Sequence, residues 1–256
     1  MRLIERVAVV TGATGDIGAA VARQLAAEGA DLVLVGRRRD RLDEVAEAAR
    51  RVGPRVLVAS ADLTVENEVR TVVARAIEEL GRVDVLVNGA ASPGAEVSLA
   101  NMSLEAWQAT MDATLTSTML CTRECLIRSM LLRRSGAIVN LASTAGLDGV
   151  AGKSHFSAAK SAVLRFTEAV AREVGGHGVR VNAVVPGPVA THRLEQYHRR
   201  MSAARGLDYD RIVEETSRTI ALRRLVTVDE VAATVVFLAS EQASGITGET
   251  ITVSGG

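Results

Sequence analysis

A glycine-rich segment follows the first apolar run of the 256-residue chain and precedes an alanine-rich stretch. The apolar residues VAVV lead into Thr11-Gly-Ala-Thr-Gly-Asp-Ile-Gly18. Between a strand and a helix, glycines let backbone N–H groups and a helix N-terminus approach a pyrophosphate. The spacing therefore predicts a dinucleotide site whose turn contains Gly12, Thr14, Gly15, Asp16, Ile17 and Gly18.

Asp16 stands where the spacing of such turns would place a glycine, and Gly15 precedes it. A carboxylate beside a pyrophosphate lowers the affinity for it unless the side chain points away, for example to cap the helix that starts there. We keep Asp16 among the predicted cofactor-site residues, with its carboxylate as the feature that needs an explanation.

Two arginines follow the second predicted strand, about twenty residues past the glycines. An acidic side chain at this place would bind the ribose hydroxyls of NAD, whereas Arg37 and Arg38 can bind a 2′-phosphate with their guanidinium groups. The sequence therefore favours NADP(H) over NAD(H). The alternative is that the arginines between positions 37 and 41 only form the solvated start of a helix, and for Arg39 and Arg41 it stays open.

Short β-branched runs alternate with longer helical patterns along the whole chain, which is typical of repeated strand–helix–strand units. We predict a single doubly wound α/β (Rossmann) domain with a mostly parallel sheet of about seven strands and helices on both faces. The expected strands are Arg6 to Thr11, Asp31 to Val35, Arg55 to Ala61, Val83 to Asn88, Gly136 to Ala142, Val179 to Val185 and Thr250 to Val253.

Glycines and one capping pattern mark the expected helix boundaries. Gly29, Gly53 and Gly81 each follow a helical pattern, and Thr227-Val-Asp-Glu230 fits a capping box. No linker divides the chain, so we expect one domain over residues 1–256. Residues 190–224 fit neither a strand nor a core helix and are predicted to form a lid or substrate-binding insertion.

Composition excludes several functional classes. Thirty basic and thirty acidic residues give a net charge of zero, which argues against nucleic-acid binding. The apolar runs are too short for a signal peptide or a membrane span, so we expect a cytoplasmic protein without a membrane partner. Cys121 and Cys125 lie four residues apart on one helix face, and the four histidines include no zinc-binding pair. We therefore expect no metal.

Taken together, these motifs resemble the short-chain dehydrogenase/reductase family over essentially the whole chain. The matching stretches beyond the turn are Asp62-Leu63, Val87 to Ala91, Ile138 to Ser143, Lys160, Asn182 to Thr191 and Gly248 to Gly256. The resemblance implies an adenine contact, a loop over the nicotinamide carboxamide and a lysine on the nicotinamide ribose. On that basis the further cofactor residues are Asp62, Leu63, Asn88, Gly89, Ala90, Lys160, Pro186, Gly187, Val189 and Thr191. It also implies a homodimer or homotetramer.

The family's catalytic group resembles a Ser, Tyr, Lys and Asn set, and this chain matches it in part. Ser143 and Lys160 are present at the matching spacing. Phe156 occupies the position of the tyrosine, four residues before Lys160, and Thr114 occupies that of the asparagine, seven residues after Trp107. In family members the phenol transfers the proton to or from the substrate oxygen, which a phenyl ring cannot do.

Another group could carry the proton in place of the phenol. His155 is the first candidate because an imidazole titrates near neutrality, although neighbouring helical residues point about 100° apart. Other candidates in the predicted lid are Tyr197, His192, His198 and Tyr209. The sequence does not choose among them.

The resemblance predicts an NAD(P)(H)-dependent oxidoreductase acting on a carbonyl or secondary alcohol of a small organic molecule, impaired to the extent that Phe156 weakens acid–base catalysis. Three alternatives stay open at this point. The chain could be a cofactor-binding pseudoenzyme or redox-neutral enzyme, a reductase of C=C bonds, or an engineered Tyr-to-Phe variant. The altered Thr114 favours natural divergence over the last of these.

Overall fold

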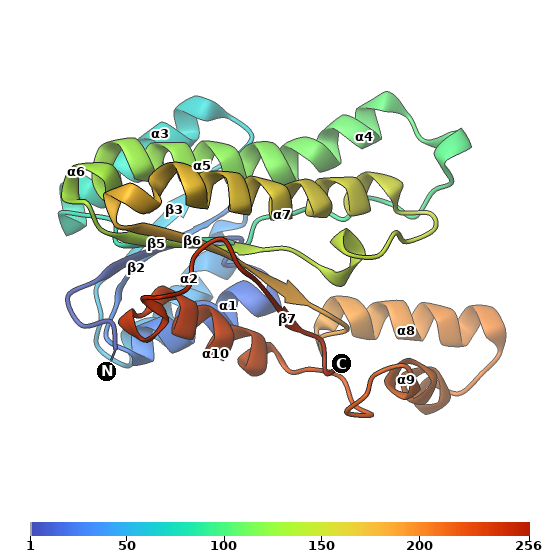
Figure 1. Cartoon of the computed structure of the whole chain (residues 1–256). Helices are drawn as coiled ribbons and strands as arrows, with labels where there is room; N and C mark the ends of the chain where they lie inside the picture. Colours follow the sequence, from blue (N-terminus) through green and yellow to red (C-terminus); the bar gives the residue numbers. More distant parts are fainter. Residues whose placement is uncertain (1) are drawn as a thin grey trace.

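A parallel β-sheet lies between two layers of helices in the computed structural model, which describes residues 2–256 (Figure 1). Seven strands lie in the order β3-β2-β1-β4-β5-β6-β7, and every pair is parallel. The strands are β1 (Val7–Thr11), β2 (Asp31–Gly36), β3 (Val56–Ser60), β4 (Val85–Asn88), β5 (Gly136–Leu141), β6 (Val179–Pro186) and β7 (Thr250–Val253). The predicted fold is confirmed.

Each inner strand is buried on both faces, which explains the continuous apolar runs. Along β1, Ala8 and Val10 belong to one core cluster, whereas Val7 and Val9 belong to the other. Successive side chains of a strand point to opposite faces, so two separate cores form. The central strands therefore have no solvent-exposed face. Polar functional side chains are expected at the ends of the strands, where the sheet reaches the surface.

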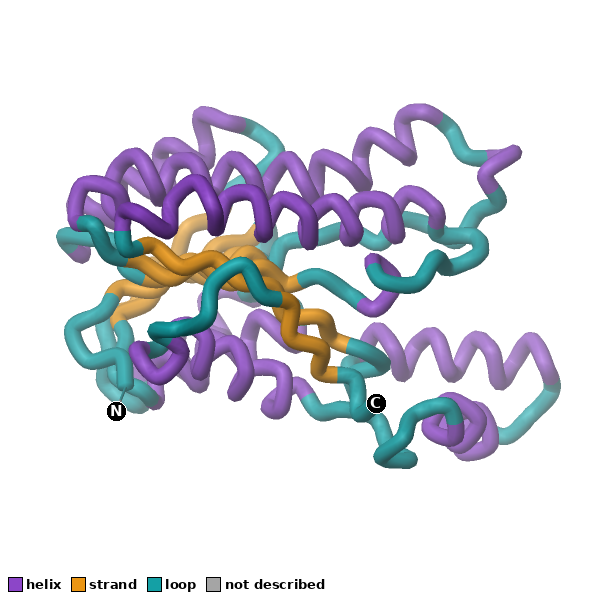
Figure 2. Tube along the Cα trace, viewed as in Figure 1, coloured by secondary structure: helices purple, strands orange, loops and turns teal. Residues whose placement is uncertain are grey.

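The core that contains Ala8 and Val10 lies between the sheet and the helices at the bottom of Figure 1. Figure 2 shows both helical layers in purple, with the orange sheet between them. The bottom layer is α1 (Asp16–Ala27), α2 (Arg39–Arg50) and α10 (Val228–Ala239). The top layer is α3 (Glu66–Leu80), α4 (Leu104–Met111), α5 (Ser117–Cys125), α6 (Leu131–Arg133) and α7 (Ser154–Val174).

The helices α4, α5 and α6 form one long rod that two π-helical segments interrupt (Figure 1). These segments are η2 (Asp112–Thr116) and η3 (Leu126–Met130). A π-turn inserts one residue into a helix and is frequent at functional sites. The segment η2 contains Thr114 and packs on α7, so this irregular turn faces the helix that carries Phe156 and Lys160.

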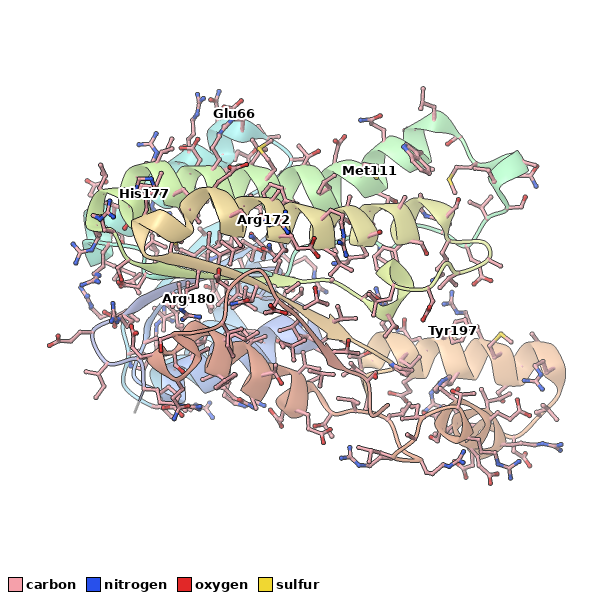
Figure 3. All side chains as sticks on the ribbon, in the orientation of Figure 1. Glu66, Met111, Arg172, His177, Arg180 and Tyr197 are labelled. Atoms are coloured by element: carbon pink, nitrogen blue, oxygen red, sulfur yellow. The ribbon has the colours of Figure 1, made fainter. Side chains whose placement is uncertain are left out.

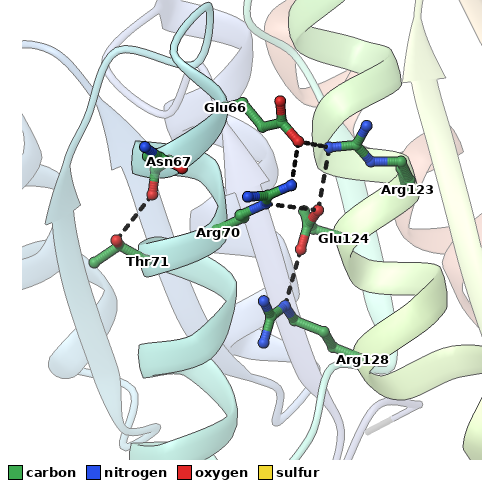
Figure 4. Close-up of polar contacts among 7 residues, drawn as sticks. All are labelled: Glu66, Asn67, Arg70, Thr71, Arg123, Glu124 and Arg128. Carbon is green, nitrogen blue, oxygen red and sulfur yellow. Dashed lines mark hydrogen bonds and ion pairs between the residues drawn. The ribbon is translucent and has the colours of Figure 1, made fainter.

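A cluster of charged residues joins α3 to α5 (Figure 4). The side chain of Glu124 is 2% exposed and contacts Arg128 Nε at 2.9 Å, Arg123 Nη2 at 3.3 Å and Arg70 Nε at 3.7 Å. Burial alone would raise the pKa of Glu124, but the hydrogen bonds from Arg128 and Arg123 outweigh it and lower the pKa. Glu66 bridges Arg70 and Arg123. The cluster fixes α5 against α3.

Residues 190–224, which we call the α8–α9 segment, contain two helices that project beyond the sheet (Figure 1). They are α8 (His192–Arg205) and α9 (Tyr209–Arg218). The sequence pattern does not predict α8, which is polar nearly all round. The shorter α9 is amphipathic, with Ile212 on its buried face, and this pattern indicated a helix that the sequence interpretation did not use. Both helices pack on each other around His198, and the segment begins and ends at a strand-like bridge between Val189 and Val226.

The predicted boundaries differ from the observed ones by two residues or fewer. Val83 and Asp84 precede β4, and Ala142 follows β5. Gly81 ends α3 in the left-handed conformation, and Thr227 with Glu230 forms the predicted capping box.

A partly buried contact fixes the end of α10 against β6. Arg180 of β6, labelled in Figure 3, donates hydrogen bonds to the carbonyls of Leu238 and Ser240 at the end of α10. Within residues 2–256, no helix is both long and apolar enough to cross a bilayer.

Candidate functional site

The turn after β1 is a cradle that only glycine can form at two places. A Cβ atom on Gly12 would lie 2.6 Å from the backbone of Gly89, and Gly12 has a φ of +66°. A Cβ on Gly18 would lie 2.3 Å from the Gly12 carbonyl oxygen, whereas one on Gly15 would meet the same oxygen at an ordinary 3.5 Å. Close backbone approach at the start of α1 is the requirement of a pyrophosphate site. The residues therefore fit a dinucleotide.

This cradle lies where the strand order reverses, between β1 and β4. Thr11 joins the two strand ends: its Oγ1 accepts hydrogen bonds from the N–H groups of Gly89 at 3.0 Å and Ala90 at 3.2 Å, and donates to Val87 O. In open α/β sheets, ligands bind in the crevice at such a switch point. The predicted stretch after β4 thus lies directly beside the glycine turn.

Asp16 does not cap α1. Gly15 is the N-cap of that helix and provides no side chain, while Asp16 Oδ2 accepts a hydrogen bond from the backbone N–H of His192, at 2.8 Å. His192 is the first residue of α8, so the Asp16 carboxylate caps α8, a helix that begins 176 residues further along the chain. The expectation that Asp16 caps its own helix was wrong, because the N-terminus of α8 offers a free donor beside the turn.

The arginines after β2 divide into two groups. Arg39 pairs with Asp43 and Arg41 pairs with Glu44 along α2, as a solvated helix start would. Arg37 and Arg38 are exposed and have no ion-pair partner among residues 2–256. Arg38 Nη2 lies 3.4 Å from the carbonyl oxygen of Thr14 in the glycine turn. Arg38 therefore stands at the edge of the cradle, and the charge of Arg37 acts on Asp62, where it helps to lower the pKa of that carboxyl.

Two predicted cofactor residues already have partners inside the protein. Asp62 Oδ1 accepts from the N–H and the hydroxyl of Thr64, and these hydrogen bonds lower the pKa of Asp62. Asn88 is buried and donates to Asn140 Oδ1 at 2.8 Å and to Thr122 Oγ1 at 3.0 Å. The NH2 group of Asn88 is thus bound by its neighbours on β5 and α5, whereas its Oδ1 is buried without a partner in the described chain. The backbone of residues 88–90 lies beside the glycine turn. Leu63 is buried.

Ser143 follows the end of β5, and Lys160 on α7 reaches the same strand end, two residues before Ser143. The Ser143 Oγ accepts the N–H of Ala145 at 3.2 Å and begins a tight turn, while Lys160 Nζ donates to Leu141 O at 2.6 Å. A Cβ on Gly146 would lie 2.7 Å from the Lys160 carbonyl carbon, so the turn packs directly on α7. Gly146 was not predicted as a site residue, although a glycine three residues after Ser143 signals such a close approach.

Burial of the Lys160 ammonium group and, to a smaller extent, the positive charge of Arg193 on α8 together lower the pKa of Lys160 from 10.5 to about 7. The only lysines of this arginine-rich chain are Lys153 and Lys160. A guanidinium stays protonated at every physiological pH, whereas an amine can lose its proton when buried. Position 160 therefore holds a cation that can titrate near neutrality.

Phe156 packs against Lys160, with the ring centroid 5.8 Å from Nζ, and is 7% exposed. Thr114 is fully buried in η2, and its Oγ1 has no hydrogen-bond partner among the described residues. The Oγ of Ser154 and Nδ1 of His155, at the start of α7, are likewise buried without a partner in the described chain. Buried polar atoms without partners are rare, and each one calls for an explanation, of which a functional role is one. Arg82 Nε, before β4, and Asn88 Oδ1 are the others in the described chain.

The candidate proton carriers lie in three different places. His155 faces the loop after β4, since a Cβ on Gly94 would lie 2.4 Å from its Nε2. His192 contacts the side chain of Gln196. His198 is buried between α8 and α9, where Nε2 and Thr216 Oγ1 are 3.1 Å apart. The rings of Tyr197, labelled in Figure 3, and Tyr209 pack around it.

The loop after β6 connects the sheet to the α8–α9 segment. Gly187 contacts Ser254 so closely that a Cβ would lie 2.6 Å from the serine Cβ, and Pro186 pairs with Val253 of β7. Val189 bridges to Val226, and Thr191 Oγ1 accepts the N–H of Leu194 as the N-cap of α8. Thr191 therefore lies at a fixed point between the sheet edge and α8.

The described residues contain no group of three or more histidine, cysteine or carboxylate side chains that could hold a metal ion. Cys121 and Cys125 are free thiols inside the core. Burial raises the pKa of Cys121 to about 12 and raises that of Cys125 well above its ordinary value. Both thiols stay protonated and act as small apolar side chains.

Comparisons with known proteins agree with this geometry. A family model described as enoyl-(acyl carrier protein) reductase matches residues 12–256. The short-chain reductase protein NovJ of Streptomyces niveus is 39% identical over 252 residues, covering 98% of this chain and 94% of that protein.

Two solved structures share the fold at full length. A variant of the actinorhodin polyketide ketoreductase with NADPH has a TM-score of 0.92 and 33% identity, covering 98% of this chain and 96% of that one. Xylitol dehydrogenase with bound NAD⁺ has a TM-score of 0.93 and 25% identity and covers all of both chains. The chain therefore belongs to the short-chain dehydrogenase/reductase family and is an NAD(P)-dependent oxidoreductase of carbonyl or alcohol substrates.

Proposed function

We propose that this oxidoreductase uses NADP(H) to interconvert a ketone and a secondary alcohol of a small organic molecule, with Ser143 and Lys160 in the reaction site. The observation that carries the proposal is that Lys160 Nζ binds the carbonyl of Leu141 at the end of β5, two residues before Ser143, and that β5 is the strand next to β4. The glycine cradle lies on the other side of β4, at the end of β1. A dinucleotide spans such neighbouring strand ends.

Ser143 is the group that orients the substrate oxygen in this proposal. Its Oγ accepts the N–H of Ala145, so its hydroxyl hydrogen is left to donate to a carbonyl oxygen. The nicotinamide, when bound, supplies or accepts the hydride. Pro186, Gly187, Val189 and Thr191 would lie along its carboxamide, and Lys160 would hold the neighbouring ribose through its ammonium group.

Lys160 also takes part in our account of the missing phenol. Phe156 cannot exchange a proton, and Lys160 Nζ is the titratable group in contact with that ring. We assign to Nζ the proton that the substrate oxygen gains or loses, because its pKa of about 7 lets it act in both directions at neutral pH. The reaction remains slower than it would be with a phenol placed between Nζ and the substrate.

The preference for NADP(H) rests on Arg37 and Arg38. Both are exposed and form no ion pair in the described chain, Arg38 contacts the glycine turn, and the charge of Arg37 acts on Asp62. Their two guanidinium groups match a 2′-phosphate, whereas Gly36 and its neighbours in the sequence provide no acid for a ribose diol.

The α8–α9 segment is the proposed lid over the substrate. It starts at Thr191, beside the nicotinamide loop, and the charge of Arg193 reaches Lys160. We further propose a cytoplasmic homodimer or homotetramer, with contacts through the rod of α4 to α6. On that rod Leu104 is 78% exposed and Leu132 is 77% exposed.

The test is turnover with NADPH and a panel of small ketones, measured for the protein as given and for Ser143→Ala and Lys160→Met. We expect slow but multiple turnovers, reduced about 10²-fold or more in each variant. Two other residues of the chain provide matched controls, because Ser161→Ala at an exposed position and Lys153→Met at a half-buried one remove the same groups elsewhere. Equal loss in the controls, or no NADPH oxidation with any ketone even after a Phe156→Tyr change, would refute the proposal.

A further inference from the structure

We infer that Asp16 is a positioning residue that fixes the start of the α8–α9 segment against the cofactor turn, at the expense of cofactor affinity. The inference rests on the proposed function, since it concerns the lid and the dinucleotide of that same site. The observation is the hydrogen bond from His192 N–H to Asp16 Oδ2, at 2.8 Å, which joins residues 176 positions apart.

The contact gives α8 a second cap. The first amides of a helix lack partners within it, and here Thr191 Oγ1 accepts the N–H of Leu194 while Asp16 accepts that of His192. A carboxylate at a helix N-terminus is favoured both by the charge-assisted hydrogen bond and by the helix dipole. Asp16 therefore stabilises the beginning of α8 more than a glycine at this place in the turn would.

The beginning of the α8–α9 segment is held by hydrogen bonds at two points, first to the chain that follows the segment and then to the glycine turn. Ala190 N–H donates to Val226 O at 2.8 Å and Val226 N–H donates to Pro188 O at 3.2 Å, which ties the two ends of the segment together. The Asp16 contact comes next along the chain and attaches α8 to the glycine turn. Beyond it the helices project away from the sheet (Figure 1). Asp16 is thus placed to set the direction in which α8 leaves.

Two site residues depend on that direction. Thr191 precedes His192 and Arg193 follows it, and the charge of Arg193 is felt at Lys160. If α8 tilted at its first residue, both side chains would move relative to Ser143 and Lys160. The same carboxylate is the first residue of α1, where a pyrophosphate would lie, so its negative charge opposes the phosphates while its hydrogen bond orders the lid.

Two substitutions separate these effects. Asp16→Asn keeps an oxygen that can accept the His192 N–H but removes the charge, whereas Asp16→Ala removes both. Asp40→Asn and Asp40→Ala are the matched controls, because Asp40 is an exposed aspartate in the first turn of α2. Amide hydrogen exchange in peptides covering residues 189–197, the Kd of NADPH and the KM of the ketone are measured for all five proteins.

For Asp16→Ala we expect exchange in residues 192–194 to accelerate about 5-fold or more and the ketone KM to rise by a similar factor. NADPH should bind at least as tightly as before. For Asp16→Asn we expect NADPH to bind severalfold more tightly, with exchange and KM close to those of the unchanged protein. The Asp40 variants should change none of the three values.

Weaker NADPH binding in both Asp16 variants, or unchanged exchange in Asp16→Ala, would overturn the inference. Hydrogen exchange and NADPH binding do not require turnover. If the protein reduces no ketone and the exchange result still appears, the proposed function fails and the role of Asp16 stands. If turnover is normal and the exchange is unchanged, the proposed function stands and the role of Asp16 fails.

Discussion

The two ends of the candidate site are built from different materials. The cofactor end is made of backbone: Gly12, Gly18 and Gly89 approach one another so closely that side chains are excluded. The reaction end is made of side chains, and there Phe156 stands in the place of a phenol while Thr114 and His155 carry buried polar atoms without partners in the described chain. Binding and chemistry are thus encoded separately, and one can change while the other is kept.

The largest effect is expected at the reaction end, from Phe156→Tyr. A phenol at this position would lie beside Lys160 Nζ and provide the missing acid–base group, so kcat/KM with a ketone should rise about 10²- to 10⁴-fold. The Kd of NADPH should stay within about 2-fold, because the cradle is untouched. Phe156→Leu is the control and should gain nothing. A gain in affinity without a gain in rate would contradict the separation of the two ends.

At the cofactor end, Gly18→Ala and Gly15→Ala form a matched pair. The added methyl at position 18 would meet the Gly12 carbonyl at 2.3 Å, whereas at position 15 it would lie at 3.5 Å. Relief of this clash must shift the backbone of the turn whose amides bind the pyrophosphate, and we expect the Kd of NADPH to rise by about 10-fold or more. Calorimetric titration should show the loss for Gly18→Ala alone. Equal Kd values for the two variants would show that the cradle does not hold the cofactor.

The arginine pair sharpens the comparison within the cofactor end. Replacing Arg37 and Arg38 together by Ala should weaken NADPH binding about 10- to 100-fold, because charge-assisted hydrogen bonds to the 2′-phosphate are lost. NADH binding should change little. The control is the pair Arg39→Ala and Arg41→Ala, whose partners are Asp43 and Glu44. A parallel loss for NADH and NADPH would assign the arginines to the fold.

A smaller effect is expected on the free energy of unfolding, which the buried charge of Lys160 lowers. Its pKa falls from 10.5 to about 7 on burial, so the unfolded chain binds more protons between those pH values and stability rises with pH across that window. Lys160→Met should therefore stabilise the protein by about 1–3 kcal/mol at pH 6.5 and by less at pH 9.5. Calorimetric melting at the two pH values tests this. An equal gain in stability at the two pH values would contradict the lowered pKa and would indicate that the Lys160 ammonium group is exposed to solvent.

The sequence predicted the fold well because period and punctuation are local signals. The apolar runs of β1 to β7 and the capping box at Thr227 depend on neighbours along the chain. The helix α8 was missed because it is polar on most of its surface and receives its second cap from Asp16, far away in the sequence. Tertiary contacts of this kind leave no periodic pattern. The helix α9 was missed although its amphipathic pattern is a local signal.

The same distinction holds for the candidate site. Spacing along the chain predicted the glycine turn, and the structure shows the close backbone approach there. Spacing also predicted the Ser143–Lys160 pair, and Lys160 Nζ binds the backbone two residues before Ser143. Spacing could not predict that the Asn88 amide is taken up by Asn140, or that Gly146 packs on Lys160. The direction of a side chain depends on the strand or helix beside it, which a single sequence does not state. The roles of these residues stay predictions.

A crystal structure of the complex with NADPH tests the account most directly. We predict the pyrophosphate on the amides of Gly12 to Gly18, the 2′-phosphate beside Arg37 and Arg38, and the nicotinamide between Ser143, Phe156 and Lys160. A nucleotide bound elsewhere, or a nicotinamide excluded from β5 by the Phe156 ring, would contradict it.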